Sequence, residues 1–498
     1  MPSAPETDPV LSAKIYAHAR RAPDRIAVVY NNNRMSYGHF ARLIEASRRY
    51  LAARVRPGTG VAVLAISSML DAWIQGLALR SLGITTLAAR ARDNIGGLGL
   101  DEIACVVVTE AEPSDEVEAA CARSGWPFIR IPRAVYAGAK TLSASDLIDP
   151  SDAPGGHILL TSGTTGLHKK VLISPEAEAA IVAHRQKILE ITERSVVDVF
   201  HYGGWTGNGY KAPADTWDAG GAIVMYQGPR PHEAVQYPEI THAYANLFVL
   251  SELLAAPEGA LRYNPAMRMF VGGAPLSQAT ADAVRARLTP QLFTTASSTE
   301  VSQFANTRIE TADDLVWHRI IPWRDVQVVD DDGRPVPPGQ TGNLRIRTMG
   351  VTGYLGDDEA TRRFFRDGYF YTGDLACRRG DGRLMLQGRV TDIINVRGSK
   401  FPVGPVEAAV RDRLGVAGVC VFSARDAEDG EVVHVALETT RRIDPSHCAA
   451  TLARVLPGVA GARFHFLDTL PRDHEGKLQR DALKRQFGLA AARAVGAG

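Results

Sequence analysis

The stretch GHILLTSGTTGLHKK, residues 156–170, joins a short apolar run to a loop with four hydroxyl side chains and two glycines. The apolar run is typical of a buried strand, and the glycines let the backbone bring N–H groups against an anion. Serine and threonine hydroxyls add donors for phosphate oxygens, and Lys169 adds positive charge. We therefore expect a loop that binds polyphosphate; the same composition also fits a mobile turn. The nucleotide-binding pattern ending in Gly-Lys-Ser/Thr is excluded, because that tripeptide occurs nowhere in the chain.

Strand and helix patterns alternate over the first 300 residues. Short apolar runs at 61–66, 104–110 and 221–226 predict buried strands, and helical periodicity covers 69–83 and 277–288. This alternation predicts an α/β fold with mostly parallel sheets flanked by helices. Ligands bind at the carboxyl ends of such strands, which is where the glycine-rich loop lies.

The pattern changes in the last third of the chain. Short strands with Gly, Pro and Asp turns predict a β-rich subdomain over about 320–388. A helix, two strands, a second helix and a last strand follow. We therefore expect an N-terminal domain over 1–388 and a small, mobile α+β C-terminal domain over 389–498.

Composition excludes several classes of function. The chain has 498 residues, of which 45% are hydrophobic, and its 56 basic residues balance 55 acidic ones, which favours neither a nucleic-acid nor an anionic-membrane partner. The N-terminus lacks a secretion signal pattern, and no apolar run is long enough to span a bilayer. The five cysteines form no CxxC pair, so we expect a cytoplasmic protein without a zinc or redox centre.

Five further segments follow the glycine-rich loop in a fixed order. They are GGAPL (272–276), STE (298–300), YTGDLA (371–376), GRVTDIINVRGSKFPVGPVE (388–407) and PRDHEGKLQR (471–480). With the loop, they resemble the signatures of the adenylate-forming superfamily of acyl-CoA synthetases, aryl-CoA ligases, luciferases and peptide-synthetase adenylation domains. The resemblance covers roughly residues 10–485.

The resemblance implies an AMP-forming acid–thiol ligase that uses ATP, Mg2+ and either CoA or a carrier-protein phosphopantetheine. It assigns catalytic roles to Thr299, Glu300 and Lys477, with Glu300 holding the metal. It implies that ATP contacts Thr161, Ser162, Gly163, Thr164, Thr165, Gly166, Lys169, Gly273, Ala274, Pro275, Asp374 and Arg389. After the acyl-adenylate forms, rotation of the C-terminal domain would withdraw Lys477 and open a thiol channel beside Gly398, Ser399 and Lys400.

Several residues depart from the superfamily pattern. His168 replaces a usual proline and Lys170 a usual glycine, and Ala296–Ser297 replaces a Tyr-Gly pair whose aromatic ring stacks on adenine. Loss of this ring would weaken nucleotide binding by about 1 kcal/mol. We expect Lys170 to add charge near the polyphosphate, so that Lys170→Gly raises the KM for ATP. Thr391 stands at the usual hinge position, followed by Asp392.

The acyl pocket is expected beside VFHYGGWTGNGYK, residues 199–211, with His201 and Trp205 from this segment and Thr295 in the floor. The segment lacks the aspartate that binds an amino group in peptide synthetases, which argues against α-amino acids. Thr295 replaces a common glycine, and a bulkier floor favours a small aryl or short-chain acid.

Two alternatives to a CoA ligase stay open. One is a stand-alone adenylation enzyme that loads a carrier protein. The other is a degenerate member that binds nucleotide or a partner without catalysis, which the departures at Lys170, Ala296 and Thr391 favour. We expect a monomer or a homodimer.

Overall fold

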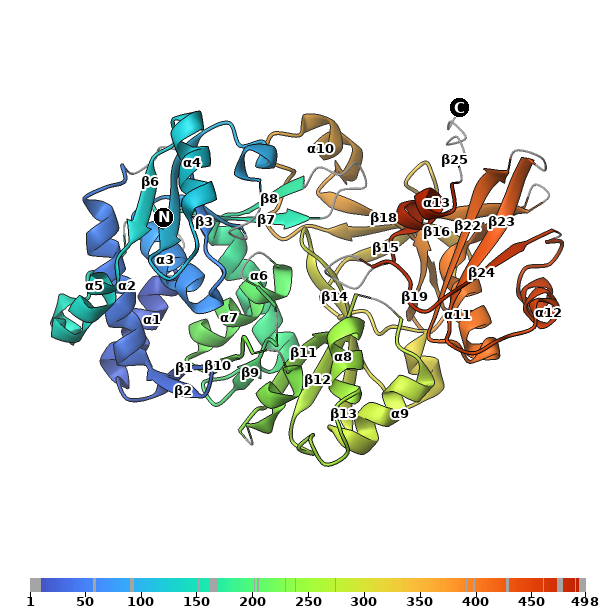
Figure 1. The fold of residues 1–498 in the computed structure, drawn as a ribbon, viewed down its shortest axis with the longest axis horizontal. Helices are drawn as coiled ribbons and strands as arrows, with labels where there is room; N and C mark the ends of the chain where they lie inside the picture. The colour runs from blue at the N-terminus through green and yellow to red at the C-terminus, as the bar shows by residue number, and fades with distance from the viewer. Residues whose placement is uncertain are drawn as a thin grey trace, which may run out of the picture.

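A computed structural model gives the fold of the chain (Figure 1). It describes residues 10–56, 60–89, 94–150, 153–161, 169–200, 202–203, 206–228, 230–237, 239–273, 275–390, 392–396, 399–426, 430–459, 461–472, 478–488 and 490–491. The helices are α1 Leu11–Arg21, α2 Tyr37–Ala52, α3 Met69–Arg80, α4 Asp115–Ser124, α5 Arg133–Gly138, α6 Pro175–Leu189, α7 Gly207–Ala219, α8 Leu247–Leu254, α9 Gln278–Arg287, α10 Asp358–Phe364, α11 Val403–Leu414, α12 Pro445–Val455 and α13 Arg480–Gln486.

Two large sheets form the first 300 residues. One has the order β6-β5-β3-β4-β7-β8 and is parallel except for the final β7–β8 hairpin. Its strands are β3 Val61–Ala65, β4 Thr85–Ala89, β5 Ile103–Thr109, β6 Phe128–Ile131, β7 His157–Thr161 and β8 Lys169–Ile173. The predicted polyphosphate loop therefore connects the two strands of a hairpin at one edge of this sheet.

The second sheet has the order β14-β13-β12-β11-β9-β10-β1-β2, with antiparallel pairs only at its two ends. Its strands are β1 Ile26–Tyr30, β2 Asn33–Ser36, β9 Val196–Asp198, β10 Ala222–Met225, β11 His242–Asn246, β12 Arg268–Gly272, β13 Gln291–Ser298 and β14 Ser302–Arg308. The terminal β13–β14 hairpin carries Thr299 and Glu300 in its turn.

Alternation of side chains along the strands builds cores on both faces of each sheet. Ala62 and Leu64 face a core shared by both sheets, whereas Val63 and Ala65 face a separate core with α4. Helices α1, α2, α3, α6 and α7 supply side chains to the shared core and lie between the sheets (Figure 1). Helices α8 and α9 cover the outer face of the second sheet. Burial on both faces explains why these strands are continuous apolar runs.

Helix α7 contains Pro213, and a tryptophan replaces the helical hydrogen bond that this proline cannot make. Proline has no N–H, so the carbonyl of Gly209, four residues earlier, loses its helical partner. The indole Nε1 of Trp73 on α3 donates to that carbonyl at 3.1 Å. The bond ties the first turn of α7 to the shared core.

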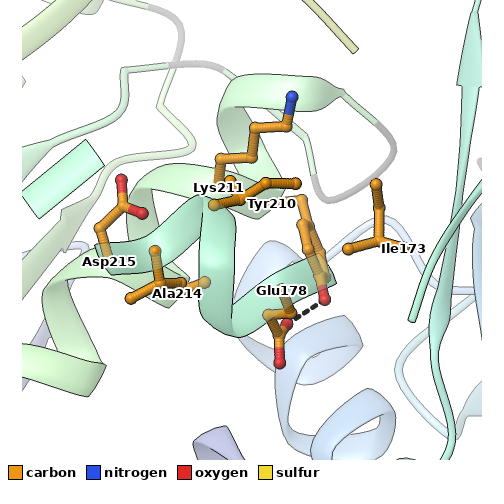
Figure 2. A pocket seen from close by; sticks show the side chains of 8 residues that line it. Ile173, Glu178, Tyr210, Lys211, Ala214 and Asp215 are labelled. Carbon is orange, nitrogen blue, oxygen red and sulfur yellow. Dashed lines mark hydrogen bonds between the residues drawn. The ribbon is translucent and has the colours of Figure 1, made fainter. Parts of the chain in front are cut away.

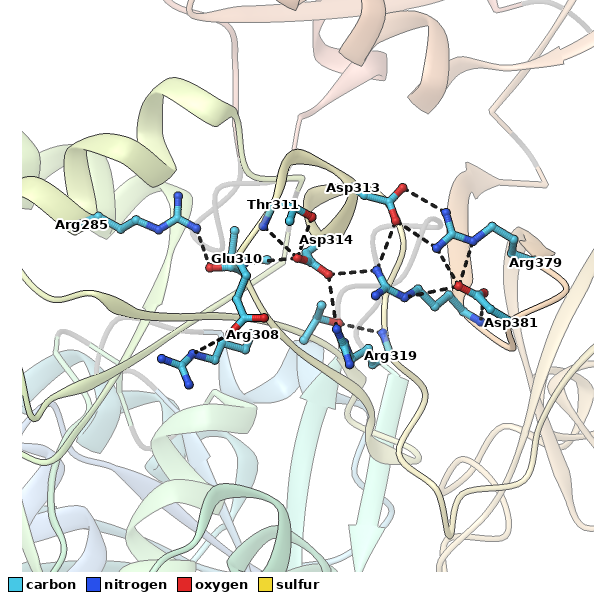
Figure 3. A network of polar contacts seen from close by, with 12 residues as sticks. Arg285, Arg308, Glu310, Thr311, Asp313, Asp314, Arg319, Arg379 and Asp381 are labelled. Atoms are coloured by element: carbon cyan, nitrogen blue, oxygen red, sulfur yellow. Dashed lines mark hydrogen bonds and ion pairs between the residues drawn. The ribbon is translucent and has the colours of Figure 1, made fainter.

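A smaller antiparallel sheet follows, with β15 Val326–Val329, β16 Thr341–Arg347, β17 Phe365–Arg366, β18 Tyr369–Arg378 and β19 Leu384–Arg389. Ion pairs join its β18–β19 turn to the segment before β15. Asp313 pairs with Arg379 at 2.9 Å (Figure 3). Arg383 pairs with Asp314 at 2.9 Å and with Asp313 at 3.2 Å. Exposed ion pairs contribute less than about 1 kcal/mol, so the pair of the buried Asp314 is the stronger anchor.

The C-terminal part contains the hairpin β20 Ile393–Val396 and β21 Ser399–Pro402, and a sheet of β22 Gly418–Asp426, β23 Gly430–Glu438, β24 Arg463–Leu467 and β25 Ala490–Ala491. Helices α11 and α12 pack on this sheet around Val410, Val421 and Leu452. The expected order of helix, two strands, helix and strand is confirmed as α11, β22, β23, α12 and β24. The domain boundary near 388 stays a prediction.

The predicted α/β fold class is confirmed, including the β-rich segment over 320–388. Within the described ranges, no helix has the length and apolar character needed to cross a membrane.

Candidate active site

The predicted polyphosphate loop is flanked by Thr161 and Lys169, which face each other across the β7–β8 hairpin. Ser162, Gly163, Thr164, Thr165, Gly166 and His168 lie outside the described residues. The Lys169 ammonium lies 3.9 Å from the ring centroid of Phe364 and 4.8 Å from that of Tyr354. Burial lowers the pKa of Lys169, and the negative charges of Glu300 and Asp357 oppose this shift.

Glu300 lies in the β13–β14 turn and is buried, with 6% of its surface exposed. The hydroxyl of Tyr354 donates to its Oε1 at 2.7 Å. Burial and the charge of Glu300 raise the pKa of the Tyr354 phenol, which therefore stays protonated as a donor. Thr299 lies beside the start of α7, since a Cβ added to Gly207 would be 3.7 Å from its Oγ1.

Asp374 and Arg389 are paired residues on β18 and β19. Arg389 Nε lies 3.1 Å from Asp374 Oδ1, and its Nη1 donates to the carbonyl of Thr372 at 2.7 Å. Gly373, which lies between Thr372 and Asp374, has a φ of +76°, a conformation that favours glycine and turns the strand at this point. After burial, the positive charges of Arg363 and Arg389 lower the pKa of Lys169 further.

This arrangement fits a magnesium–polyphosphate group. Magnesium prefers oxygen ligands and keeps waters and substrate phosphates in its coordination shell, so one carboxylate such as Glu300 suffices on the protein side. Within the described ranges, no group of three or more metal-ligating side chains gathers, as a self-contained protein cage would require. Lys169 and Arg389 would supply positive charge to phosphate oxygens bound there.

The predicted adenine side lies at the carboxyl ends of β12 and β13. Gly273 adopts a φ of +92° directly after β12, Pro275 is exposed, and Ala274 is outside the described residues. Ala296 is buried opposite Ala305 of β14, so a small side chain fills the predicted stacking position. Thr295 pairs with Gly272, where an added Cβ would lie 3.1 Å from the threonine Oγ1.

The comparisons with known proteins agree with this geometry. A family described as AMP-binding enzyme matches residues 15–355. The chain belongs to the AMP-binding enzyme family. The resemblance to the adenylate-forming superfamily is thereby confirmed.

Among relatives of this AMP-binding enzyme, the indoleacetate–CoA ligase of Aromatoleum aromaticum is 27% identical over 357 residues, covering 68% of each chain. The fatty acid–[acyl-carrier-protein] ligase ScoC of Streptomyces coeruleorubidus is 28% identical over 361 residues, again covering 68% of each chain. The o-succinylbenzoate coenzyme A synthetase of Bacillus subtilis, solved with ATP and magnesium, shares the fold with a TM-score of 0.77 at 21% identity, covering 95% of this chain and 99% of that one.

For Lys170 of this AMP-binding enzyme, the structure contradicts the expectation that its charge lies near the polyphosphate. Its Nζ donates to the carbonyl oxygens of Leu98 at 3.1 Å and Gly99 at 2.6 Å. Successive residues of a strand point to opposite faces, so Lys169 lies over Tyr354, the partner of Glu300, while Lys170 faces the loop before β5. The expectation that Lys170 adds charge at the polyphosphate is wrong.

The predicted acyl-pocket residues His201 and Trp205 lie outside the described residues. Just before them, Asp198 at the end of β9 is fully buried and accepts a hydrogen bond from the Phe200 N–H at 2.8 Å. This bond supports Phe200, whose φ of +43° is unusual for a residue with a side chain. Burial raises the pKa of Asp198 to about 7.

Lys477, Gly398 and Thr391 lie outside the described residues, and Ser399 and Lys400 are described only as backbone in β21. The flanking segments are anchored: Arg480 binds Asp392 at 2.9 Å and Glu407 at 2.6 Å. Asp392 belongs to the predicted hinge, and Arg480 ends the lysine motif, three residues after Lys477. One arginine thus ties the hinge to the segment after Lys477.

Sequence reasoning missed two residues that contact this site. Tyr354 lies in the turn VTGYLG (351–356), where an aromatic residue between two glycines was a usable signal. Lys211 on α7 is buried and donates to the carbonyls of Ser298 and Thr299. Burial, then the charge of Arg185, lowers the pKa of Lys211 to about 7. The sequence feature that could have indicated Lys211 is the presence of a lysine in a segment that we expected to line the acyl pocket.

Proposed function

We propose that the chain activates a carboxylic acid with ATP, forming an acyl-adenylate and pyrophosphate, and then transfers the acyl group to a thiol. The observation that carries this proposal is that the Lys169 ammonium and the Glu300 carboxylate both contact one tyrosine, Tyr354, with the Asp374–Arg389 ion pair as the second element. These charged residues come from β8, the β13–β14 turn, β18 and β19. Two cations and two carboxylates in this arrangement suit a magnesium-bound nucleotide.

Adenylation requires a carboxylate to approach the α-phosphorus while charge develops on pyrophosphate, so positioning and electrostatics dominate. The loop after Thr161, together with Lys169, holds the terminal phosphates. Glu300 would hold Mg2+, which would neutralise phosphate charge, and Thr299 would donate to the α-phosphate. Asp374 would accept hydrogen bonds from the ribose hydroxyls, and Arg389 would contact ribose and phosphate.

Lys477 approaches the α-phosphate from the C-terminal part of the chain during adenylation. A lysine suits this role because it is a compact charge on a flexible stem. The segment with Gly398, Ser399 and Lys400 then borders the thiol channel during transfer. Replacement of Lys477 by alanine should abolish adenylation while leaving ATP binding.

A small aryl or short-chain acid is the proposed substrate. The close approach of Thr295 Oγ1 to Gly272 supports a shallow pocket floor. One relative, the indoleacetate–CoA ligase, is named for an aryl acid.

CoA is the proposed acceptor. A carrier-protein phosphopantetheine is the second candidate, supported by the similarity to a fatty acid–[acyl-carrier-protein] ligase. Transfer of radiolabelled acid to free CoA or to a carrier protein separates the two acceptors.

Acid-dependent exchange of pyrophosphate into ATP, measured over a panel of aryl and aliphatic acids, tests the proposal. Exchange with at least one small acid supports it. Nucleotide binding without exchange for any acid supports the degenerate, binding-only alternative.

A further inference from the structure

Two basic side chains, the buried Lys211 and the partly buried Arg324, hold the backbone on both sides of Glu300. Lys211 Nζ donates to the carbonyl oxygens of Ser298 at 3.2 Å and Thr299 at 3.1 Å. Arg324 Nη2 donates to the carbonyl oxygen of Val301 at 2.8 Å. Carbonyls immediately before and after the glutamate are therefore drawn toward fixed positive groups.

The β13–β14 turn is an irregular one that needs such anchors. The pairing register shifts between Ala296 and Ser297, so the ladder is broken just before the turn. Ser302, at the start of β14, has a φ of +58°, a conformation that costs energy for a residue with a side chain. A turn of this kind persists only when its surroundings fix it.

Lys211 lies in the first turns of α7, and the contacts of Gly209 fix the position of this part of the helix. The Thr206 side chain accepts from the Gly209 N–H at 2.9 Å. A Cβ on Gly209 would lie 2.0 Å from the carbonyl oxygen of Gly203, so only glycine permits this close turn. The indole of Trp73 completes the anchor through the Gly209 carbonyl.

Figure 2 shows the Lys211 side chain extending away from the carboxyl groups of Glu178 and Asp215. Its stem lines a small cavity between α6 and α7. Of the charged groups near its ammonium, Arg185 and Asp215 form a buried ion pair at 2.5 Å, and the repulsion by Arg185 exceeds the attraction by Asp215. Arg324 repels the ammonium, and Glu300 attracts it. The ammonium is thus directed to the turn that bears Glu300.

We propose that Lys211 is a positioning residue for Glu300, and hence for the magnesium ion that accompanies ATP. The inference rests on the proposed function for the assignment of Glu300 as the metal ligand. By fixing the carbonyls of Ser298 and Thr299, Lys211 keeps the glutamate side chain turned toward the nucleotide. It acts through the turn and does not touch the reacting atoms.

Calorimetric ATP titrations with and without Mg2+ test this role without requiring turnover. The variant is Lys211→Met, which keeps the apolar stem and removes the donors. The matched control is Lys170→Met, because Lys170 also donates to two carbonyls but at a different loop. We expect Mg2+ to tighten ATP binding in the unmodified enzyme and in the control, and this enhancement to fall by about tenfold or more in Lys211→Met. ATP affinity without Mg2+ should change less than about twofold.

An unchanged magnesium enhancement in Lys211→Met overturns the inference, as does unmodified enzyme whose ATP binding is independent of Mg2+. If Lys211→Met does not fold, Lys211→Leu, which also removes the donors but has a shorter apolar side chain, is judged by the same criteria. Failure of the proposed function looks different: the unmodified enzyme then binds ATP with Mg2+ but exchanges pyrophosphate with no acid.

Discussion

Tyr354 donates its hydroxyl to Glu300 Oε1 at 2.7 Å, and both side chains are buried. The bond fixes the carboxylate that faces Lys169. We predict that Tyr354→Phe, which keeps the ring beneath Lys169, lowers the rate of ATP–pyrophosphate exchange about tenfold, since hydrogen bonds to charged groups are worth about 1.5–3 kcal/mol. Exchange kinetics at saturating ATP measure this effect. An unchanged rate would show that the phenol does not orient Glu300.

Lys170→Gly should leave the KM for ATP within about twofold of the unmodified enzyme. Its ammonium donates to the carbonyls of Leu98 and Gly99, so the substitution should lower the stability of the fold and not the affinity for ATP. Two lost hydrogen bonds correspond to about 1–3 kcal/mol, so thermal unfolding should shift downward. A raised ATP KM with unchanged thermal stability would restore the polyphosphate role that the geometry argues against.

Asp374→Asn should raise the KM for ATP about tenfold, because an amide accepts ribose hydroxyls less strongly than a carboxylate. The Asp374–Arg389 pair is partly exposed, and such pairs contribute less than about 1 kcal/mol to stability. Thermal unfolding should therefore be nearly unchanged. Parallel measurement of exchange kinetics and unfolding separates a nucleotide contact from a structural ion pair.

Asp198→Asn should stabilise the protein at alkaline pH. Burial raises the folded-state pKa of Asp198 from 3.8 to about 7, so its contribution to stability is fully present below pH 3.8 and is lost as pH rises to 7. Above that pH the buried carboxylate is charged, at a penalty of up to about 4 kcal/mol. The gain from asparagine, measured as the shift in thermal unfolding, should be small near pH 4 and largest at pH 8. A gain that is independent of pH would contradict this account.

Sequence patterns predicted most of the fold because the parallel strands are buried on both faces. The expected strand over 61–66 is β3, Val61–Ala65, and the expected helix over 277–288 is α9, Gln278–Arg287. The hairpin strand β8 was not predicted, since Lys169 and Lys170 interrupt its apolar pattern. Missing that strand led directly to the wrong placement of Lys170.

The candidate site was predicted only where ordered motifs marked it. Glu300, Asp374 and Arg389 each lie in such a motif. Tyr354 and Lys211 do not, and their contacts join residues 54 and 87 positions apart in the chain. Local patterns carry no information on such distant pairs, and a lysine within a helix ordinarily predicts a solvated charge.

The adjacent lysines of β8 allow the most direct test of the central claim, which is that the chain activates acids at the Lys169–Glu300 site. Acid-dependent ATP–pyrophosphate exchange is measured for the unmodified enzyme, Lys169→Met and Lys170→Met over a panel of small aryl and aliphatic acids. We predict exchange with at least one acid, retained by Lys170→Met and lowered about a hundredfold in Lys169→Met, because Lys169 lies over Tyr354, the partner of Glu300, whereas Lys170 is bonded to the carbonyls of Leu98 and Gly99. Absence of exchange with every acid, or an equal loss in both variants, would contradict the account.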